Sequence, residues 1–236
     1  PRSADQLPLP ADSPEALFPA GYGLQTAGAW QLVWQDEFNG EEIDLSNWTF
    51  NLGGGGWGNG EDQYYTDRPE NAHLENGNLV IEARREDFKD YRFTSVRMKT
   101  QGLHAWTYGR IEARIRIPSG QGIWPAFWML GSNINARGWP YCGEIDIMEH
   151  VGKEPFNIHH ALHGPGYSGG ENVGGYERLA FPANAVFHVF AIEWEAGEIR
   201  WYIDGELIDT ISADRVPGDW VYDHDFFILL NVAVGG

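Results

Sequence analysis

The apolar residues of this chain fall in short segments rich in β-branched and aromatic side chains, and helical periodicity is almost absent. Residues 110–117 alternate strictly between charged or small and apolar positions. Because successive side chains of a β-strand point to opposite faces of a sheet, this alternation predicts a strand with one wet and one buried face. We predict further strands in the segments that share this composition: Leu79–Arg84, Arg110–Ile117, Phe187–Trp194, Ile199–Asp204 and Phe226–Val234.

Two dipeptides between these segments have the composition of hairpin turns, Ala196-Gly197 and Asp204-Gly205. Short strands joined by tight turns favour an all-β fold, an antiparallel β-sandwich. A length of 236 residues fits one sizeable sandwich, which we place at residues 30–236. Residues 1–29 hold several Pro and Ala and no strand pattern, so we expect an N-terminal tail or linker there.

The negative net charge of the chain restricts the classes of partner that it can bind. Acidic residues outnumber basic ones 34 to 16, for a formal net charge of −18. Nucleic acid and anionic membranes would be repelled, whereas a neutral polysaccharide would be indifferent to this charge. No apolar run is long enough for a transmembrane helix. The single cysteine, Cys142, excludes an intrachain disulfide, and we expect it to be a small buried filler.

The stretch Gly143–His150, with the sequence GEIDIMEH, is the candidate for chemistry. In a regular strand Glu144 and Asp146 share one face, but Glu149 turns to the other face with the isoleucines. A β-bulge that absorbs one extra residue, Met148 or a neighbour, returns Glu149 to the face of the other two acids. We therefore predict a bulged strand here.

Three carboxylates on one face repel each other, and glycoside hydrolysis with retention supplies a reason to group them. One carboxylate attacks the anomeric carbon while a second, protonated, donates to the leaving oxygen, with the two about 5–5.5 Å apart. An acid between them shares a proton or hydrogen bond and tunes both pKa values. The alternative is a solvated acidic strand edge that discourages aggregation.

The same octapeptide resembles the active-site signature of glycoside hydrolase family 16, in the form with an extra Met found in its laminarinases (endo-β-1,3-glucanases). The family's licheninases have one residue fewer. Other segments resemble the family in the same order: Trp34–Gly40, Gly58–Glu61, Gln63–Thr66, Glu75–Leu79, Tyr108–Arg114, Gly122–Leu130, His163–Tyr167 and Trp201–Gly205. The resemblance runs from about Trp30 to the end of the chain, and it implies a jelly-roll sandwich with a substrate cleft across its concave sheet.

The resemblance also implies roles. Glu144 would be the nucleophile, Glu149 the general acid and then base, and Asp146 the residue that holds Glu144 in the right protonation state. The substrate-binding residues would be Asn59, Glu61, Arg97, Trp124, Trp128, His163 and Asn231, with His163 bonded to sugar or to Glu149. Trp124 and Trp128 are four apart and share a face of a strand, so we expect them to stack on sugar rings rather than form a pair in the core.

His159, His160 and His163 suggest a metal site, but His159 and His163 have a helical spacing in a segment that has strand character, so we expect no metal there. The family usually has His-Gly-Thr where this chain has His159-His160-Ala161. We expect this difference to change individual contacts with the sugar units, and not the catalytic chemistry. No cofactor for catalysis is expected. The resemblance implies a structural Ca²⁺ held partly by backbone oxygens of Glu37 and Gly77, which an Asp from a later strand normally completes.

Family members usually continue beyond Asn231–Gly236 through a loop and a closing strand, which we expect to be missing from this sequence. The resemblance implies an endo-acting, retaining hydrolase that cleaves β-1,3 bonds in laminarin-like glucans, extracellular and monomeric. Mixed-linkage glucan hydrolysis, transglycosylation and a non-catalytic β-glucan-binding lectin are the alternatives. Retention of both glutamates weighs against the lectin.

Overall fold

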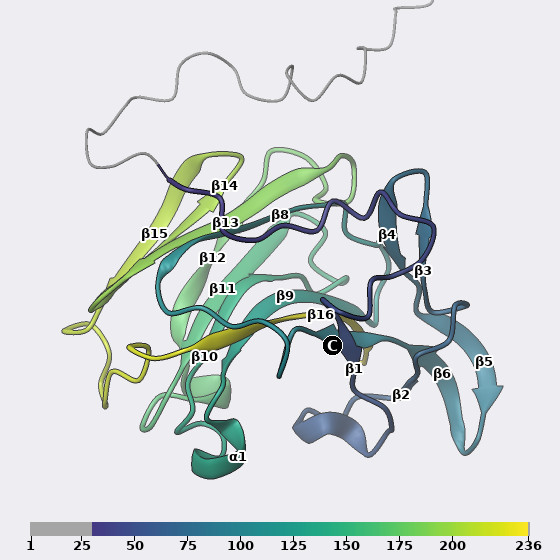
Figure 1. Cartoon of the computed structure of the whole chain (residues 1–236), viewed down its shortest axis with the longest axis horizontal. Helices are drawn as coiled ribbons and strands as arrows, with labels where there is room; N and C mark the ends of the chain where they lie inside the picture. Colours follow the sequence, from purple (N-terminus) through teal and green to yellow (C-terminus); the bar gives the residue numbers. More distant parts are fainter. Residues whose placement is uncertain (1–29, 236) are drawn as a thin grey trace, which may run out of the picture. The chain divides into compact units, whose positions relative to one another are not determined.

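The structure, a computed structural model, describes residues 30–235, and the predicted tail at residues 1–29 lies outside them. Two stacked sheets dominate, with the four-stranded sheet above the seven-stranded sheet in Figure 1. The seven-stranded sheet has the order β1 (Thr49–Phe50), β7 (Arg97–Lys99), β16 (Phe226–Val234), β9 (Ile123–Gly131), β10 (Glu144–Glu149), β11 (Asn157–His163) and β12 (Val173–Arg178). All its pairings are antiparallel.

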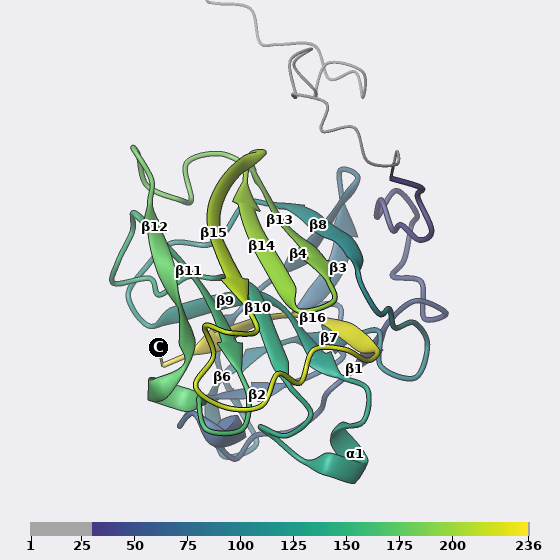
Figure 2. The same ribbon diagram turned by 90° about the vertical axis from the view of Figure 1, so that its left-hand side faces the viewer.

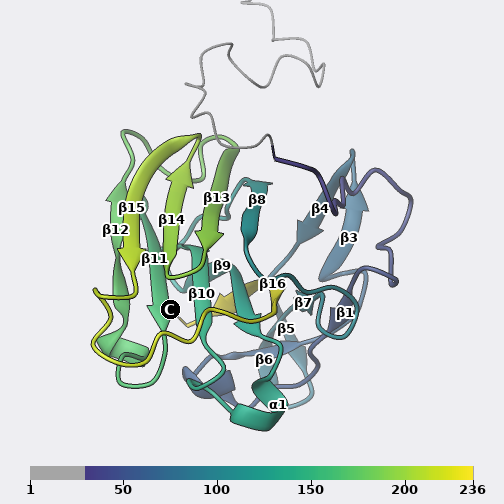
Figure 3. The same ribbon diagram turned by 60° about the vertical axis from the view of Figure 1, so that its left-hand side comes forward.

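The four-stranded sheet has the order β15 (Glu206–Ser212), β14 (Glu198–Ile203), β13 (His188–Glu195) and β8 (Gly109–Ile115). Both predicted hairpin turns are confirmed, because Glu195 pairs with Glu198 and Ile203 with Glu206. Asp204 and Gly205 both have positive φ, the conformation that a two-residue hairpin turn requires. Within the described residues β8 has a strand partner on one edge only, and the β3–β4 hairpin (Ala72–Glu75 and Asn78–Ile81) lies beyond its other edge in Figure 3.

A smaller sheet joins β2 (Gln63–Tyr65), β6 (Tyr91–Ser95) and β5 (Arg84–Phe88), and its β2–β6 pairing is parallel, an exception to the antiparallel prediction. The predicted strand Leu79–Arg84 is in fact two pieces, since β4 ends at Ile81 and β5 begins at Arg84. The described helices are short: α1 (Ile134–Arg137) and the 3₁₀ turns Gly56–Gly58 and Gly169–Glu171. No described helix is long and apolar enough to cross a membrane.

The main core lies between the two large sheets. Alternate residues of each strand enter it, among them Ile145, Trp194, Trp201 and Phe226, all essentially without exposed surface. The other face of the seven-stranded sheet carries a second apolar cluster that includes Trp128 and Cys142. Cys142 is buried, as predicted, and burial with the nearby Glu144 charge raises the pKa of its thiol to about 11. This outer face is where the predicted site lies.

Candidate active site

The central strand β10 contains the predicted bulge. Asp146 pairs with Trp128 of β9, but the next pairs are Met148 with Phe127 and Glu149 with Ala126. Two residues of β10 after Asp146 thus advance the register by one on β9, and the pairing with β11 shifts at the same point. Ile147 and Met148 both join the inner core, so Glu149 emerges on the outer face with Glu144 and Asp146.

A tryptophan of the opposite sheet supports this bulge. Because a bulge interrupts the ladder of backbone hydrogen bonds, a freed carbonyl group needs another donor. The buried indole Nε1–H of Trp201 on β14 donates to the backbone oxygen of Asp146 at 2.9 Å. The bulge is therefore tied to the packing between the two sheets.

Burial dominates the electrostatics of the three carboxyl groups. It raises the pKa of Glu144, Asp146 and Glu149 to about 8 each, and the charge of Asp146 adds to the effect on both glutamates. The charges of His163 and Arg97 act in the opposite direction on Glu144. Groups this close titrate together, so at neutral pH they share protons rather than ionise independently.

His163 of β11 lies directly across from Glu144 in the sheet. Its Nε2 is 3.0 Å from Asp146 Oδ2 and 3.7 Å from Glu144 Oε1, so among the acids its contacts are with these two and not with Glu149. A hydrogen bond from His163 to sugar, the other predicted contact, stays a prediction. The backbone N–H of Gly169 donates to its Nδ1 at 3.1 Å, which leaves Nε2 as the protonated nitrogen of the neutral ring. Asp146 Oδ2 lies close to this nitrogen but accepts no well-aimed hydrogen bond in the described structure.

Two indole groups orient the two glutamates. Trp124 Nε1–H donates to Glu149 Oε1 at 2.8 Å, and Trp139 Nε1–H donates to Glu144 Oε2 at 3.0 Å. Trp124 was predicted for the cleft, whereas Trp139, in the loop between α1 and β10, was not predicted at all. Trp139 is 47% exposed, so its ring is open to a ligand while its N–H is held by the carboxylate.

Two recesses lie on either side of the carboxylates. The Arg97 recess, of about 240 Å³, is lined by Asn51, Trp57, Arg97, Lys99, Leu130 and Leu229 among others. The Tyr176 recess, of about 280 Å³, is lined by Trp124, Glu149, His159, Ala161, Gly174 and Tyr176 among others. The segment His159–Ala161, where the chain departs from the family pattern, thus forms part of the second recess.

Arg97 is held between two aromatic rings, 5.1 Å from the ring centre of Trp57 and 4.6 Å from that of Trp128. Burial lowers the pKa of this guanidinium from its ordinary value, and its charge acts on Glu144. Trp128 shares the outer face with Trp124 as predicted, but it is only 7% exposed. It therefore forms the floor beneath Arg97 rather than an open platform.

A buried hydrogen-bond network supports that floor. Trp128 Nε1–H donates to Asn231 Oδ1 at 2.7 Å, Asn231 Nδ2 donates to the Tyr65 hydroxyl at 3.3 Å, and Tyr65 donates to Glu61 Oε2 at 2.9 Å. Asn59, which is exposed, donates to Glu61 Oε1 at 3.1 Å. Asn231 and Glu61 are thus committed to neighbouring side chains, and of these three predicted residues only Asn59 faces solvent.

The three histidines of β11 do not converge. His159 lies 3.0 Å from Glu154, His160 lies 2.9 Å from Asp209 on the inner side of the sheet, and His163 faces the acids. The three imidazoles therefore have three different partners in the described structure. Elsewhere, Glu37 is exposed and Gly77 lies at the turn between β3 and β4. A Cβ placed on Gly40 would be 3.9 Å from Leu74, so the segment after Glu37 runs beside that hairpin.

The comparisons with known proteins agree with this geometry. The profile of Glycosyl hydrolases family 16 matches residues 59–227. The chain is 44% identical over 219 residues to a beta-glucanase of Rhodothermus marinus, covering 88% of this chain and 76% of the relative. It is also 44% identical over 225 residues to a glucan endo-1,3-beta-glucosidase of Cryptopygus antarcticus, covering 89% and 82%.

Among solved structures, the catalytic domain of an endo-1,3-beta-glucanase (laminarinase) from Thermotoga petrophila superposes with a TM-score of 0.85 at 49% identity, covering 89% of each chain. The family profile spans more than half of the chain, and these relatives are covered over most of their length. The chain therefore belongs to glycosyl hydrolase family 16, with its jelly-roll sandwich.

Proposed function

We propose that this protein is an endo-acting, retaining β-1,3-glucanase of laminarin-like glucans. The observation that carries the proposal is the bulged strand β10, which places Glu144, Asp146 and Glu149 on one open face with an indole N–H on each glutamate. The relatives named as laminarinase and glucan endo-1,3-beta-glucosidase support the β-1,3 linkage.

In the first step the Glu144 carboxylate attacks the anomeric carbon as the glycosidic C–O bond breaks. Glu149 gives its proton to the leaving oxygen, and a covalent glycosyl-enzyme forms. In the second step Glu149, now a carboxylate, takes a proton from water, which attacks the same carbon and releases Glu144. The stereochemistry at the anomeric carbon is inverted twice and so retained.

Burial favours the protonated form of all three carboxyl groups, and catalysis needs a negative charge on the nucleophile alone. Arg97 and the Trp139 N–H both act on Glu144, which favours the negative charge there. Burial raises the pKa of Glu149 and so keeps the proton on it, as a general acid requires. Asp146, 3% exposed and between the two, takes up the proton that Glu144 must lose.

The proposal is tested with Glu149→Gln, assayed on laminarin and on an aryl β-laminaribioside. The phenolate leaving group of the aryl substrate needs no proton. We expect laminarin hydrolysis to fall by about 10²–10⁴-fold, the range typical of lost general acid catalysis, while the first step on the aryl substrate is largely spared. Equal loss on both substrates, with the fold intact by circular dichroism, would remove Glu149 from the acid role.

Linkage specificity is tested by incubating the parent enzyme with laminarin, lichenan and agarose and separating the products by chromatography. We expect a ladder of laminari-oligosaccharides, since an endo-acting enzyme cuts within the chain. Products from lichenan alone would indicate a mixed-linkage enzyme, and larger products than the starting oligosaccharide would indicate transglycosylation. Binding without any product would indicate a glucan-binding lectin.

We further propose that catalysis needs no cofactor, and that the protein acts as an extracellular monomer, since a glucan polymer is met outside the cell. A structural Ca²⁺ near Glu37 and Gly77 fits the approach of that segment to the β3–β4 hairpin, because calcium accepts backbone oxygens. Calcium would then raise the melting temperature and a chelator would lower it, without moving the pH profile of activity.

A further inference from the structure

The Tyr176 recess lies mainly on the β11–β12 side of the catalytic strand, with Trp124 of β9 at its other border. It is lined by Glu149 and not by Glu144, and it extends across β11 to β12, the edge strand at the left of Figure 2. The Arg97 recess lies on the opposite side, and it includes Leu130, the residue that pairs with Glu144. A glucan that crosses the strand must therefore enter both recesses.

The positions of the two glutamates assign the direction of the chain. A general acid contacts the oxygen of the leaving sugar, whereas a nucleophile contacts the anomeric carbon of the sugar that stays bound. The recess lined by Glu149 therefore receives the leaving sugar. The recess in which the Arg97 charge acts on Glu144 receives the sugar that becomes covalently attached.

Tyr176 is placed to meet that leaving sugar. Glu149 pairs with His159 across the β10–β11 ladder, and His159 pairs with Tyr176 across the β11–β12 ladder. The three residues thus form a row across three strands on one face. With strands about 4.8 Å apart, the Tyr176 backbone lies roughly 10 Å from that of Glu149, and His159 stands between them in the row.

The Tyr176 ring is oriented but not covered. It contacts the imidazole of His159 with ring centres 5.7 Å apart and planes at 45°, and His159 is itself 3.0 Å from Glu154. Tyr176 is nevertheless 61% exposed. A large aromatic side chain that is supported at one edge and open on its face is suited to stack on the C–H surface of a sugar ring.

Beside the His159–Tyr176 pair, the floor of the recess carries almost no side-chain bulk. Ala161 pairs with Gly174, so a methyl group and a hydrogen face the recess where larger residues would fill it. A Cβ on Gly174 would lie 2.1 Å from the backbone oxygen of His160, so no other residue fits there without moving β12. The cavity of about 280 Å³ is close to the size of small-ligand pockets.

We propose that Tyr176 is the stacking platform for the glucosyl unit on the leaving-group side of the cleaved bond. This inference rests on the proposed glucanase function and adds the residue that recognises the released part of the substrate. Tyr176 contributes binding only when a sugar occupies its recess. Substrates without a leaving sugar are turned over without it.

The test compares Tyr176→Ala, Tyr176→Phe and the parent on two substrates, laminarihexaose and laminaribiosyl fluoride. Fluoride leaves without a sugar in the Tyr176 recess. We expect Tyr176→Ala to lower kcat/KM on laminarihexaose about tenfold, mostly through KM, and to change the fluoride rate less than twofold. Tyr176→Phe keeps the ring and should restore most of the hexaose rate. Leu207→Ala, exposed on the outer face of β15, serves as the surface control.

Three results would overturn the proposal. Equal losses on both substrates would make Tyr176 a structural residue, and an unchanged hexaose rate in Tyr176→Ala would remove it from the leaving side. In both cases the parent still hydrolyses laminarin, and the proposed function stands. Absence of turnover by the parent on either substrate would instead overturn the glucanase function and the subsite with it.

Discussion

Replacing Asp146 by Asn should make the protein more stable at neutral and alkaline pH while making the enzyme slower. Burial raises the pKa of Asp146 from its ordinary value of 3.8 to about 8. Between about pH 4 and pH 8 the folded protein therefore holds a proton that the unfolded chain has released. The free energy of unfolding falls as pH rises through this window, and an Asn, neutral at every pH, removes that loss.

The size of the effect follows from the same values. A difference of about four pH units, at about 1.4 kcal/mol each, sets a ceiling of about 6 kcal/mol. Glu144 and Glu149 compete for the same protons, so the part that belongs to Asp146 alone is smaller, on the order of 2 kcal/mol at pH 8. For a chain of this length, that corresponds to a rise in melting temperature of about 4–8 °C.

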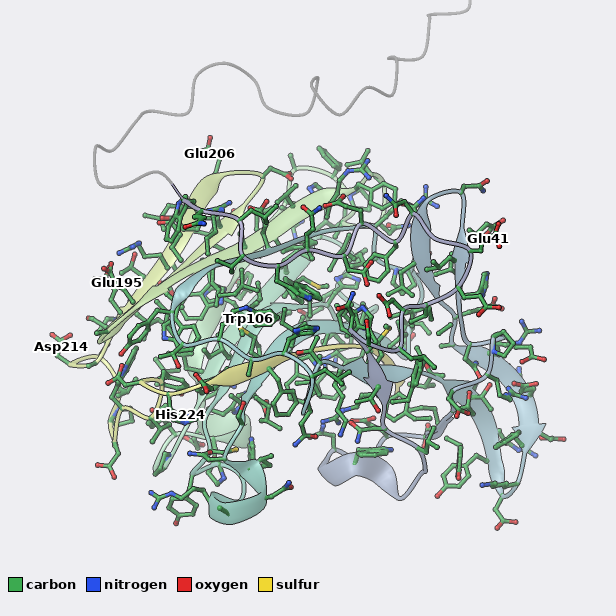
Figure 4. The ribbon with its side chains drawn as sticks, viewed as in Figure 1. Glu41, Trp106, Glu195, Glu206, Asp214 and His224 are labelled. Carbon is green, nitrogen blue, oxygen red and sulfur yellow. The ribbon has the colours of Figure 1, made fainter. Side chains whose placement is uncertain are left out.

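The assay is urea unfolding of the parent and Asp146→Asn at pH 4.5, 6 and 8. We expect the stability difference to grow with pH and to be small at pH 4.5. Glu206→Gln is the control for net charge. It removes one negative charge at an exposed position of β15, the edge strand of the four-stranded sheet, where Figure 4 labels Glu206. A stability difference that is absent at pH 8, or equal at all three pH values, would refute a protonated Asp146.

Asp209→Asn is a control of the opposite sign. Burial alone would raise the pKa of Asp209, but hydrogen bonds from His160 and from the Thr210 N–H lower it below its ordinary value. Its stabilising contribution is present above the ordinary pKa and lost as pH falls through the lowered value. Asp209→Asn should therefore cost stability at pH 8, where Asp146→Asn gains it.

Four further results are expected. Glu144→Ala should be inactive on laminarin until azide is added, which should yield a glycosyl azide of inverted configuration; a folded variant that gives none has not lost the nucleophile. The pH profile of kcat/KM should be bell-shaped, because catalysis needs a charge on Glu144 and a proton on Glu149; its limbs report the shared titration of the buried carboxyl groups, with the alkaline limb near pH 8, and a flat profile from pH 5 to 9 would contradict this. Deleting Met148 should leave a regular, folded strand with some activity on laminarin, whereas an Ala inserted after it should cost more than about a hundredfold; the reverse order would contradict the bulge. Trp139→Phe should lower kcat about tenfold with little change in KM, because it removes the N–H on Glu144, and an unchanged kcat would show that this bond does not matter.

Local pattern was enough to predict much of the fold. Alternation at residues 110–117 and the turns at 196–197 and 204–205 depend on neighbours in the chain, and β8, β13, β14 and β16 appear close to where they were expected. The bulge in β10 was also predictable, because Glu144, Asp146 and Glu149 fit one face in no other way. The interruption between β4 and β5 was not predictable, because Glu82 and Ala83 carry no strong turn signal.

Contacts between distant segments could not be read from the same pattern. His163 was expected to bond to sugar or to Glu149, but pairing of β11 with β10 places it across from Glu144. Asn231 was expected at the sugar, yet the indole of Trp128, 103 residues away, takes its side-chain oxygen. In both cases the partner is set by strand register, which depends on the whole sheet.

The sequence by itself determined strands β8, β13, β14 and β16, the two hairpin turns, the bulge and the three acids, because each depends on residues within one turn or strand. The tertiary structure decided which groups tune those acids and where the substrate runs. Trp139 reaches Glu144 from a loop, and Tyr176 joins the row of Glu149 only because β11 pairs with both β10 and β12. Periodicity is a property of neighbours along the chain, whereas a site is assembled from segments that only packing and register bring together.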